Sequence, residues 1–309
     1  MTLRVTFLGT AGAVPTVQRN TASLFVNRDG DRLLFDVGEG TQRQMMRYGT
    51  GFAVSTLFLT HLHGDHVLGL PGLIQTWGFN DRDDPLTIVT PDGTRADVWA
   101  FLEALDTDPA FPVTVEEIAA GETAYRAEEY AVRAIPADHD TPAVGYVLEE
   151  DDRRGRFDRD RAEALGVPVG PKFSELHAGN PVELEDGTVV DPDEVVGDPR
   201  PGRTLVYTGD TRPLESTVDA AADADLLVHD ATFAASEAAR ARDTAHSTAR
   251  EAGDIASRAA VKRLALVHVS SRYAGDTTPL VTDAEAVFDG EVFVPADGDE
   301  RAIPYPDEA

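Results

Sequence analysis

Cysteine is absent from this chain of 309 residues. Disulfides, thiolate metal sites and cysteine nucleophiles are therefore excluded, and any metal ion has to be held by nitrogen and oxygen ligands. Lysine is almost absent as well, because Lys172 and Lys262 are the only two, and arginine supplies the other fixed positive charges.

Long apolar runs are also missing. No run reaches the roughly 18 residues that a membrane span needs. The first residues, MTLRVTFLGTAGAVP, alternate like a strand and lack the basic, apolar and small-residue zones of a signal peptide. We therefore expect a soluble, cytoplasmic protein with no membrane partner. At 42% hydrophobic residues, the chain can still bury a substantial core.

Positive charge is scarce against a large excess of acid, and the net charge is −28. Such a chain either binds basic partners or works at very high salt, where a carboxylate-rich surface stays hydrated. The acidic residues are spread along the whole chain, which favours a halophilic protein. At molar salt the Debye length is only about 3 Å, so the net charge says little about nucleic-acid binding.

Ligand-type side chains follow several short apolar runs. The runs have the length and composition of strands. Because the carboxyl ends of neighbouring strands meet at one edge of an open α/β sheet, we expect an α/β fold with a site at that edge. STLFLT leads to His61, YAVRAIPAD to His139, RTLVYTG to Asp210, DLLV to His229 and Asp230, and RLALV to His268.

Helical patterns separate these strands. VLGLPGLIQTWGF is apolar on all sides and predicts a buried helix. Residues 94–105 have one apolar face, with Thr94 as the expected N-cap. Thr248, followed by Glu251 three residues later, predicts a capping box at the start of another helix.

Residues 150–202 break the pattern, because they are rich in glycine, proline and charge and poor in long apolar faces. They predict an insertion with its own turns, in which His177 is exposed. From the residues alone, a solvated loop of mixed charge is favoured, since acidic residues interleave with the basic ones. The densest basic patch of the chain lies here: Arg153, Arg154, Arg156, Arg159 and Arg161.

The segment HLHGDH, residues 61–66, places three of the chain's eight histidines and an aspartate in six positions. His61 and His63 can share one side of an extended turn, and Gly64 lets the backbone bend so that Asp65 and His66 point elsewhere. Polar side chains between apolar runs are costly to bury unless something pairs with them. The segment therefore predicts a site for two neighbouring metal ions.

The residues at the other strand ends complete this site. Imidazole and carboxylate ligands suit Zn²⁺, so we expect two zinc ions per subunit, while Mn²⁺ and Fe²⁺ also fit. Ions about 3.5–4 Å apart would hold a bridging hydroxide and stabilise a phosphoryl transition state. We assign His61, His63 and His139 to one ion, Asp65, His66 and His268 to the other, and Asp210 to both.

The HxHxDH motif, followed in order by His139, Asp210 and His268, resembles the metallo-β-lactamase superfamily, whose fold is a four-layer αβ/βα sandwich. Nearly the whole chain resembles ribonuclease Z, a family of tRNA 3′-processing endonucleases. The motifs are GTAGAVPTVQRNTAS, AVGY, YTGDTRP, HDATF, AHST and GVPVGP. The resemblance implies one metallo-β-lactamase-fold domain over residues 1–309, with 150–202 as an inserted, flexible tRNA-binding arm.

The resemblance also implies an activity. A member of this family removes the 3′ trailer from precursor tRNA by hydroxide attack on the phosphodiester and leaves a 3′-hydroxyl on the tRNA. Asp65 would be a metal ligand and the catalytic proton acceptor, and His246 would stabilise the scissile phosphate or protonate the leaving oxygen. Asp230 stands where the family usually has glutamate, and it would orient His246 or relay a proton.

Further implied features concern RNA and assembly. The family forms homodimers in which the arm of one subunit grips a tRNA whose end lies in the other subunit's site. The arginine patch and Lys172 would then bind phosphates. Arg19 and Asn20 lie in PTVQRN, which resembles the family's loop near the RNA 3′ end, with Val17 where lysine is common.

Other interpretations of these residues remain open. His246 could simply precede an N-cap, although a helix N-terminus favours an anion, and His229 is expected to be structural or to support a ligand. GTAGAVPT lacks the Gly-Lys-Ser/Thr ending of a phosphate loop. A small-substrate hydrolase of the same superfamily is an alternative function. A non-catalytic, metal-dependent RNA-binding protein is a third, against which Asp65 and His246 argue.

Overall fold

The computed structural model describes residues 2–307 and divides into two compact units. The core unit comprises residues 2–149 and 203–304, and the arm unit comprises residues 150–202 together with 305–307. The insertion expected from composition has the same bounds as the main segment of the arm unit. No sequence pattern indicated that the C-terminal residues pack with it.

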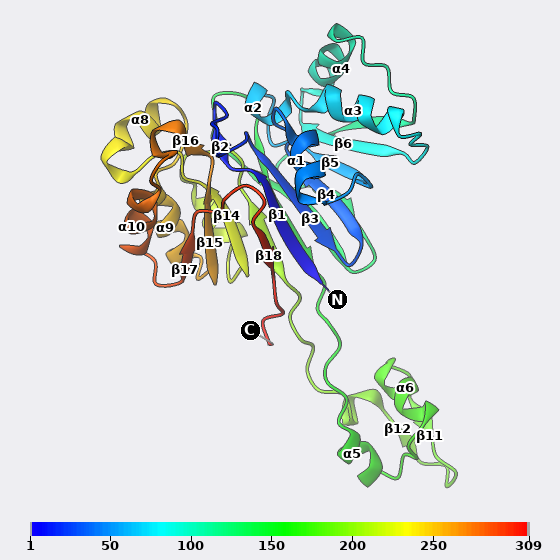
Figure 1. Cartoon of the computed structure of the whole chain (residues 1–309). Helices are drawn as coiled ribbons and strands as arrows, with labels where there is room; N and C mark the ends of the chain where they lie inside the picture. Colours follow the sequence, from blue (N-terminus) through cyan, green and yellow to red (C-terminus); the bar gives the residue numbers. More distant parts are fainter. Residues whose placement is uncertain (1, 308–309) are drawn as a thin grey trace. The chain divides into compact units, whose positions relative to one another are not determined.

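Two seven-stranded sheets form the centre of the core unit (Figure 1). The first has the order β18-β1-β3-β4-β5-β6-β7, antiparallel from β18 to β4 and parallel from β4 to β7. Its strands are β1 (Leu3–Gly9), β3 (Ser23–Arg28), β4 (Asp31–Phe35), β5 (Thr56–Phe58), β6 (Leu86–Pro91), β7 (Val113–Ile118) and β18 (Glu300–Ala302).

The second sheet has the order β17-β15-β14-β13-β10-β9-β8, and its four strands from β13 to β17 are parallel. Its strands are β8 (Thr123–Arg126), β9 (Tyr130–Pro136), β10 (Val144–Glu150), β13 (Thr204–Tyr207), β14 (Leu226–Asp230), β15 (Arg263–Val267) and β17 (Glu291–Phe293). A two-stranded ribbon pairs β2 (Ala11–Gly12) with β16 (Val269–Ser270).

Helices cover the outer face of each sheet. α1 (Thr41–Tyr48), α3 (Leu70–Phe79) and α4 (Arg95–Ala104) pack on the first sheet. α7 (Glu215–Ala220), α9 (Ala249–Arg258) and α10 (Thr278–Glu285) cover the second. A third apolar cluster lies between the sheets, where Phe35 stacks on Phe58 with ring centroids 4.7 Å apart. These four layers are the αβ/βα sandwich that the resemblance implied.

The strand-end residues gather as expected, but they come from two sheets rather than one. β5, which leads to His61, belongs to the first sheet, whereas β9, β13, β14 and β15 belong to the second. The expectation of a single sheet edge was therefore wrong. A strand pattern shows where a strand ends, but it carries no information about which sheet the strand joins.

The segment expected to be one buried helix is divided and partly exposed. α2 (Gly64–Val67) ends before α3 begins, and the side chains of Leu68 and Phe79 are 52% and 90% exposed. The prediction of full burial was wrong because an all-apolar sequence does not show which of its faces the core covers. Among the described residues, no helix has the length and apolar character to cross a bilayer.

The two predicted helix starts behave differently. Thr248 and Glu251 form the expected capping box, with the Glu251 N–H donating to Thr248 Oγ1 at 3.2 Å and the Thr248 N–H donating to the Glu251 carboxylate at 2.8 Å. Thr94 occupies the N-cap position of α4, but its hydroxyl donates to the Pro91 carbonyl at 2.6 Å instead of capping the helix. A turn preceding the helix competes there for the same side chain.

The arm unit has a small core of its own. α5 (Arg159–Ala164), α6 (Pro171–His177) and a hairpin of β11 (Val182–Glu183) and β12 (Val189–Val190) surround it. The composition of this segment obscured the core because its apolar residues are few and far apart. The buried members are Ala162, Val167, Leu176, Val182, Val190 and Val195.

Candidate metal centre

The segment HLHGDH covers the end of the short connection that follows β5 and the first three residues of α2. His61 is fully buried, His63 is half-buried and extended, and Gly64 begins α2 with a helical rather than a left-handed conformation. Asp65 and His66 then fall on the first turn of this helix. The change from strand to helix at Gly64 therefore separates the two pairs of polar side chains, as the motif predicted.

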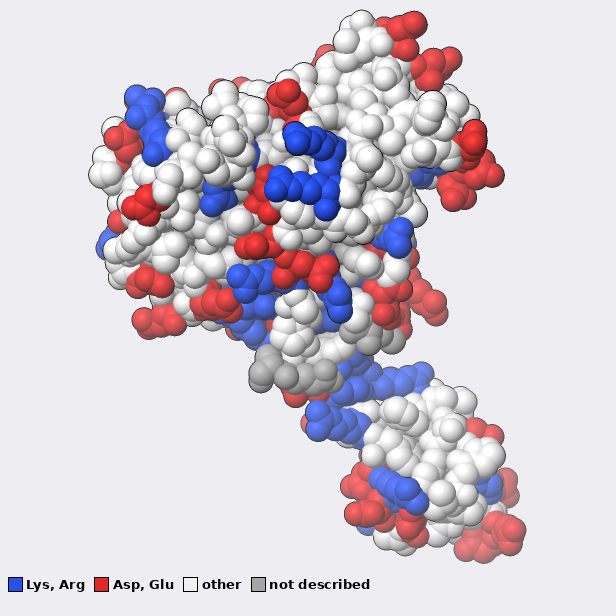
Figure 2. Space-filling view, viewed as in Figure 1, with Lys and Arg blue, Asp and Glu red and all other residues white. Residues whose placement is uncertain are grey.

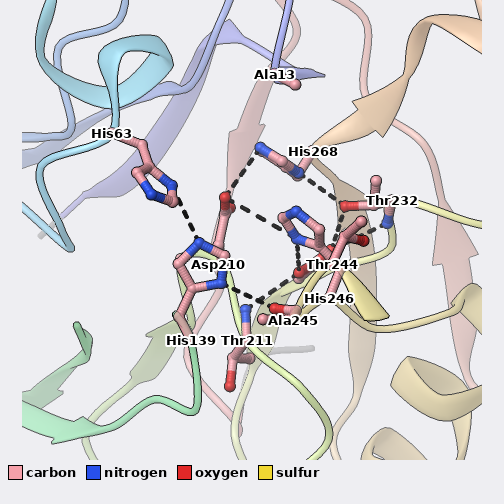
Figure 3. A network of polar contacts seen from close by, with 12 residues as sticks. Ala13, His63, His139, Asp210, Thr211, Thr232, Thr244, Ala245, His246 and His268 are labelled. Atoms are coloured by element: carbon pink, nitrogen blue, oxygen red, sulfur yellow. Dashed lines mark hydrogen bonds and ion pairs between the residues drawn. The ribbon is translucent and has the colours of Figure 1, made fainter. Parts of the chain in front are cut away.

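The predicted ligands meet in overlapping groups, each of which brings its donor atoms within 4.8 Å of one another. Asp210 belongs to every group, which is the position of a shared ligand. Figure 3 shows His63, His139, His246 and His268 around Asp210. The groups are His61, His63, His139 and Asp210; Asp65, His66, Asp210 and His268; and Asp210, Asp230, His246 and His268.

The donor atoms fit divalent metal ions. His61 Nε2, His66 Nε2 and Asp210 Oδ1 are buried, and none has a hydrogen-bond partner among the described residues. A buried polar atom without a partner is costly unless an ion or water pairs with it. Four or more imidazoles beside buried carboxylates are a ligand set that transition-metal ions prefer.

Each buried imidazole is oriented through its other ring nitrogen. His61 Nδ1 contacts Thr60 Oγ1 at 3.0 Å, His139 Nδ1 contacts the Ala245 carbonyl at 2.9 Å, and His268 Nδ1 contacts Thr232 Oγ1 at 2.7 Å. Such partners fix the tautomer and the ring orientation of metal-binding histidines. The Nε2 atoms of these rings are thereby left for the centre of the site.

Asp36 is a site residue that our sequence analysis missed. Its fully buried carboxylate contacts His66 Nδ1 at 2.8 Å and accepts hydrogen bonds from the Thr60 N–H at 2.8 Å and the Tyr207 hydroxyl at 2.9 Å. The same signal that marked the ligands could have found it, because Asp36 follows the apolar run LLF at the end of β4.

Asp65 is held from two directions. Its Oδ2 atom accepts a hydrogen bond from the Ala13 N–H at 2.8 Å and lies 3.1 Å from His268 Nε2. Burial would raise the pKa of Asp65, but the hydrogen bond to His268 and the charge of His66 hold it below the usual value. The Asp65 carboxylate is therefore ionised at neutral pH.

Asp230 organises the side of the centre that carries His246 (Figure 3). Its fully buried carboxylate contacts His246 Nδ1 at 2.8 Å and accepts from the Thr211 N–H at 3.1 Å and the Thr232 hydroxyl at 2.7 Å. Burial alone would lower the pKa of His246, but the Asp230 carboxylate raises it to about 9. The short aspartate side chain thus reaches His246 directly.

His229 stands apart from the candidate ligands. Its ring is buried, its Nδ1 contacts the Asp230 carbonyl at 2.8 Å, and it belongs to none of the ligand groups found among the described residues. Burial lowers its pKa, which keeps the ring neutral. This placement agrees with the structural part expected of it.

The predicted RNA-binding residues of the core unit have internal partners. Arg19 Nη1 donates to Thr10 Oγ1 and to the Pro295 carbonyl, both at 2.6 Å. Asn20 Nδ2 donates to the Glu39 carbonyl at 2.6 Å. RNA contact by Arg19 and Asn20 stays a prediction, and both side chains are already engaged within the protein.

In the arm unit, basic side chains gather around one carboxylate near the chain's end. Asp307 pairs with Arg153, with Arg156 at 3.2 Å and with Arg200 at 3.3 Å, and the Arg153 guanidinium lies 3.4 Å from the centre of the Tyr305 ring. The arm carries four other predicted RNA contacts. Arg154 donates to the His177 carbonyl, and Lys172 donates to the Glu183 carbonyl. Arg159 pairs with Glu163, and Arg161 is exposed.

Comparison with known proteins places this geometry in a family. A family model described as "Anti-Pycsar protein Apyc1" matches residues 3–131. A curated relative named ribonuclease Z from Natronomonas pharaonis is 62% identical, with 100% of both chains covered. Another, from Haloferax volcanii, is 63% identical over 99% of this chain and 97% of its own.

Solved structures agree at the level of the fold. Human tRNase Z, short form, is 26% identical with a TM-score of 0.70, covering 97% of this chain and 99% of its own. The metallo-β-lactamase fold protein YhfI from Bacillus subtilis is 20% identical with a TM-score of 0.70, covering 98% of this chain and 100% of its own. With a metallo-β-lactamase fold and full-length relatives of this identity, the chain belongs to the ribonuclease Z family.

Proposed function

We propose that the protein is an endoribonuclease that removes the 3′ trailer from precursor tRNA, with two zinc ions per subunit as its cofactor. One observation carries the proposal: two groups of metal ligands share Asp210, with Asp65 and His246 beside them, in a chain 62% identical to a protein named ribonuclease Z. The cytoplasm is the compartment we propose for it.

The chain's own groups account for the proton transfers of phosphodiester hydrolysis. Divalent ions held by the ligand groups would lower the pKa of a water molecule and neutralise charge on the phosphoryl group. Asp65, ionised and held by the Ala13 N–H, accepts the proton of the attacking water. The new bond joins the water oxygen to phosphorus, and the bond to the 3′-oxygen of the tRNA breaks.

His246 serves the leaving group. Because Asp230 raises its pKa to about 9, His246 is protonated at neutral pH. It donates a hydrogen bond to the scissile phosphate or delivers its proton to the leaving 3′-oxygen. The tRNA then ends in a 3′-hydroxyl, and the phosphate stays on the trailer. Asp230 orients the imidazole for this step.

For substrate binding we propose that the arm unit contacts the body of the tRNA. Arginine pairs well with phosphate because its planar guanidinium offers paired N–H donors. The candidate contacts are Arg153, Arg154, Arg156, Arg159, Arg161 and Lys172. The grouping of three arginines at Asp307 supports this, because it brings several guanidinium groups together on one part of the arm unit.

We also propose a homodimer formed through α3 and its surroundings. Residues 67–80 contain no charged side chain, although 27% of the chain's residues are charged, and Phe79 on α3 is 90% exposed. Figure 2 shows acidic side chains scattered over much of the remaining surface in that view. An exposed apolar area on so acidic a molecule marks a contact surface.

The function is tested with purified protein, a trailer-bearing precursor tRNA and bis(p-nitrophenyl) phosphate, each with and without a chelator and at several salt concentrations. We expect cleavage just after the discriminator nucleotide, abolished by the chelator and by Asp65→Ala. Hydrolysis of the small diester without cleavage of the precursor would instead indicate a small-substrate hydrolase. RNA binding that needs metal but is unaffected by Asp65→Ala, with no cleavage, would indicate a binding protein.

A further inference from the structure

A partly buried carboxylate outside the metal centre joins three segments that are far apart in the sequence. Asp297 Oδ1 accepts a hydrogen bond from the Thr10 hydroxyl at 2.9 Å. Its Oδ2 accepts from the Asn20 N–H at 2.6 Å and from Gln44 Nε2, on α1, at 2.8 Å. Thr10 and Asn20 are the two ends of one loop, so this carboxylate closes the loop at its base.

Further hydrogen bonds join the two ends of the loop of residues 10–20. The carbonyl of Asn20 accepts from the N–H groups of both Thr10 and Ala11, at 2.9 and 2.8 Å. Arg19 reaches across the base to Thr10 Oγ1 and to the Pro295 carbonyl. The segment that carries Asp297 is itself tied to β1, because the Gly298 N–H donates to the Phe7 carbonyl at 2.7 Å. We call Asp297, Arg19, Thr10, Asn20 and Gln44 the loop clasp.

The other end of the same loop touches the metal centre. The Ala13 N–H donates to Asp65 Oδ2 at 2.8 Å. A Cβ atom on Gly12 would lie 2.5 Å from His268 Nδ1, so the loop backbone packs directly against this ring. In addition, β2 pairs with β16, which begins one residue after His268.

The backbone conformation of Ala13 indicates that contacts from the surrounding structure fix the loop. Its φ angle is 62°, in the left-handed region that residues with a Cβ atom rarely adopt. Such conformations persist where the surrounding structure determines them, and they cluster at functional sites. The N–H of this same residue donates to Asp65.

We propose that Asp297 is a positioning residue of the metal centre. Through the loop clasp it holds the loop of residues 10–20 so that the Ala13 N–H fixes Asp65 and the backbone of Gly12 fixes His268. Both residues belong to the second ligand group, and Asp65 is the proton acceptor of the proposed function, on which the catalytic part of this inference rests. Loss of the clasp therefore weakens the retention of one ion and slows the chemical step.

The test compares Asp297→Asn with Asp225→Asn. Asp225 is a buried aspartate that accepts from the Thr204 N–H at 2.8 Å and from Lys262 Nζ at 2.6 Å, next to the start of β14 and away from its Asp230 end. Both substitutions remove one carboxylate charge from the core unit, buried at Asp225 and partly buried at Asp297. Only Asp297→Asn acts on the loop that reaches Asp65.

For each variant we would measure metal ions per chain after dialysis against a chelator, the thermal midpoint, and kcat and KM on bis(p-nitrophenyl) phosphate and precursor tRNA. We expect Asp297→Asn to lose about one ion per chain and to lower kcat by about 10- to 100-fold, with little change in KM. Asp225→Asn should lower only the thermal midpoint. Wild-type metal retention and kcat in Asp297→Asn would overturn the inference.

Arg19→Gln separates the loop clasp from direct RNA binding. A clasp residue affects hydrolysis of the small diester as well as cleavage of precursor tRNA, whereas an RNA contact affects only the precursor. Diester hydrolysis at the wild-type rate in Arg19→Gln would therefore contradict the clasp. If the wild-type protein retains two ions but does not cleave precursor tRNA, the proposed function fails, and the metal retention of Asp297→Asn still decides this inference.

Discussion

His66 illustrates how single residues prepare this site. Burial alone would lower its pKa, but the carboxylates of Asp210 and Asp36 raise it well above the usual value. A divalent ion at the position shared with Asp210 would replace the proton on Nε2, because a metal ligand must be neutral imidazole. Asp36 would remain as the acceptor for Nδ1–H and fix the ring for the ion.

We therefore predict that Asp36→Asn lowers metal affinity or activity by about 10- to 100-fold, the usual cost of removing such a partner. In this variant the asparagine amide would also have to accept the hydrogen bonds that the Thr60 N–H and the Tyr207 hydroxyl donate to the Asp36 carboxylate in the wild type. Titration of the metal-free variant with zinc would measure the change. An affinity equal to that of the wild type would show that Asp36 does not orient His66.

His246 gives a second prediction, on pH dependence. Its pKa is raised to about 9, so the protonated form needed for leaving-group protonation is present below that pH and is lost as the pH rises through it. Asp230→Asn removes the charge that raises this pKa. We expect the alkaline limb of the profile of kcat/KM against pH to move to lower pH.

The matched control is Asp219→Asn, an exposed position on α7 that changes the net charge equally. Its profile should coincide with that of the wild type. An alkaline limb that stays in place in Asp230→Asn would mean that His246 is not the group that titrates.

At this scale the sequence pattern pointed to the candidate ligands more readily than to the groups that hold them in place. The rule that polar residues follow apolar strands found His61, His139, Asp210 and His268, which the structure brings together. The same rule would have found Asp36. It could not have found the Ala13 N–H or the Ala245 carbonyl, because backbone groups leave no mark in the residue pattern.

At the scale of elements, the arm unit is inserted between two adjacent strands. β10 and β13 are antiparallel neighbours, with Glu149 opposite Thr204. A Cβ on Gly202 would lie 2.3 Å from the Glu150 carbonyl oxygen, so the two ends of the insertion are in contact. The unit can therefore be replaced by a short turn that converts β10 and β13 into a hairpin.

We predict that replacing residues 151–201 with a two-residue turn, and ending the chain after Pro304, lowers the affinity for precursor tRNA by about tenfold or more. Hydrolysis of bis(p-nitrophenyl) phosphate should stay near the wild-type rate because the metal centre belongs to the core unit. A chain that ends after Pro304 but keeps the arm is the control for the missing tail. Unchanged affinity for precursor tRNA would remove the arm from substrate binding.

Some features of the helices and strands could be predicted from the sequence, and others could not. Strand ends and the Thr248 capping box depend on local residue patterns, so they could be recognised. The division of the strands between two sheets and the exposed end of α3 depend on partners distant in the chain. The docking of Tyr305 under Arg153 is of the same kind, since it joins residues about 150 positions apart.

The whole molecule carries a net charge of −28, from which we predicted a halophilic protein. Its full-length relatives come from halophilic organisms, which agrees with that prediction. Surface ion pairs contribute little at high salt because the charges are screened. Apolar contacts are strengthened by excluded salts. An association through the uncharged α3 surface is therefore suited to such conditions.

We predict that the wild-type chain, of 33.2 kDa, sediments at high salt as a dimer and that Phe79→Asp sediments as a monomer. The substitution places a charge on a side chain that is 90% exposed in the single chain, so it should not disturb folding. Val189→Asp, at an exposed apolar position in the arm unit, should remain dimeric. A monomeric wild type would contradict the proposed dimer.

We propose that the two groups of ligands joined through Asp210 hold a pair of divalent ions. The most direct measurement is the number of metal ions per chain in active, purified protein, determined by elemental mass spectrometry for the wild type and Asp210→Ala. We expect two ions per wild-type chain and loss of both in the variant, because the shared ligand serves each site. Active wild-type protein without stoichiometric metal would contradict it.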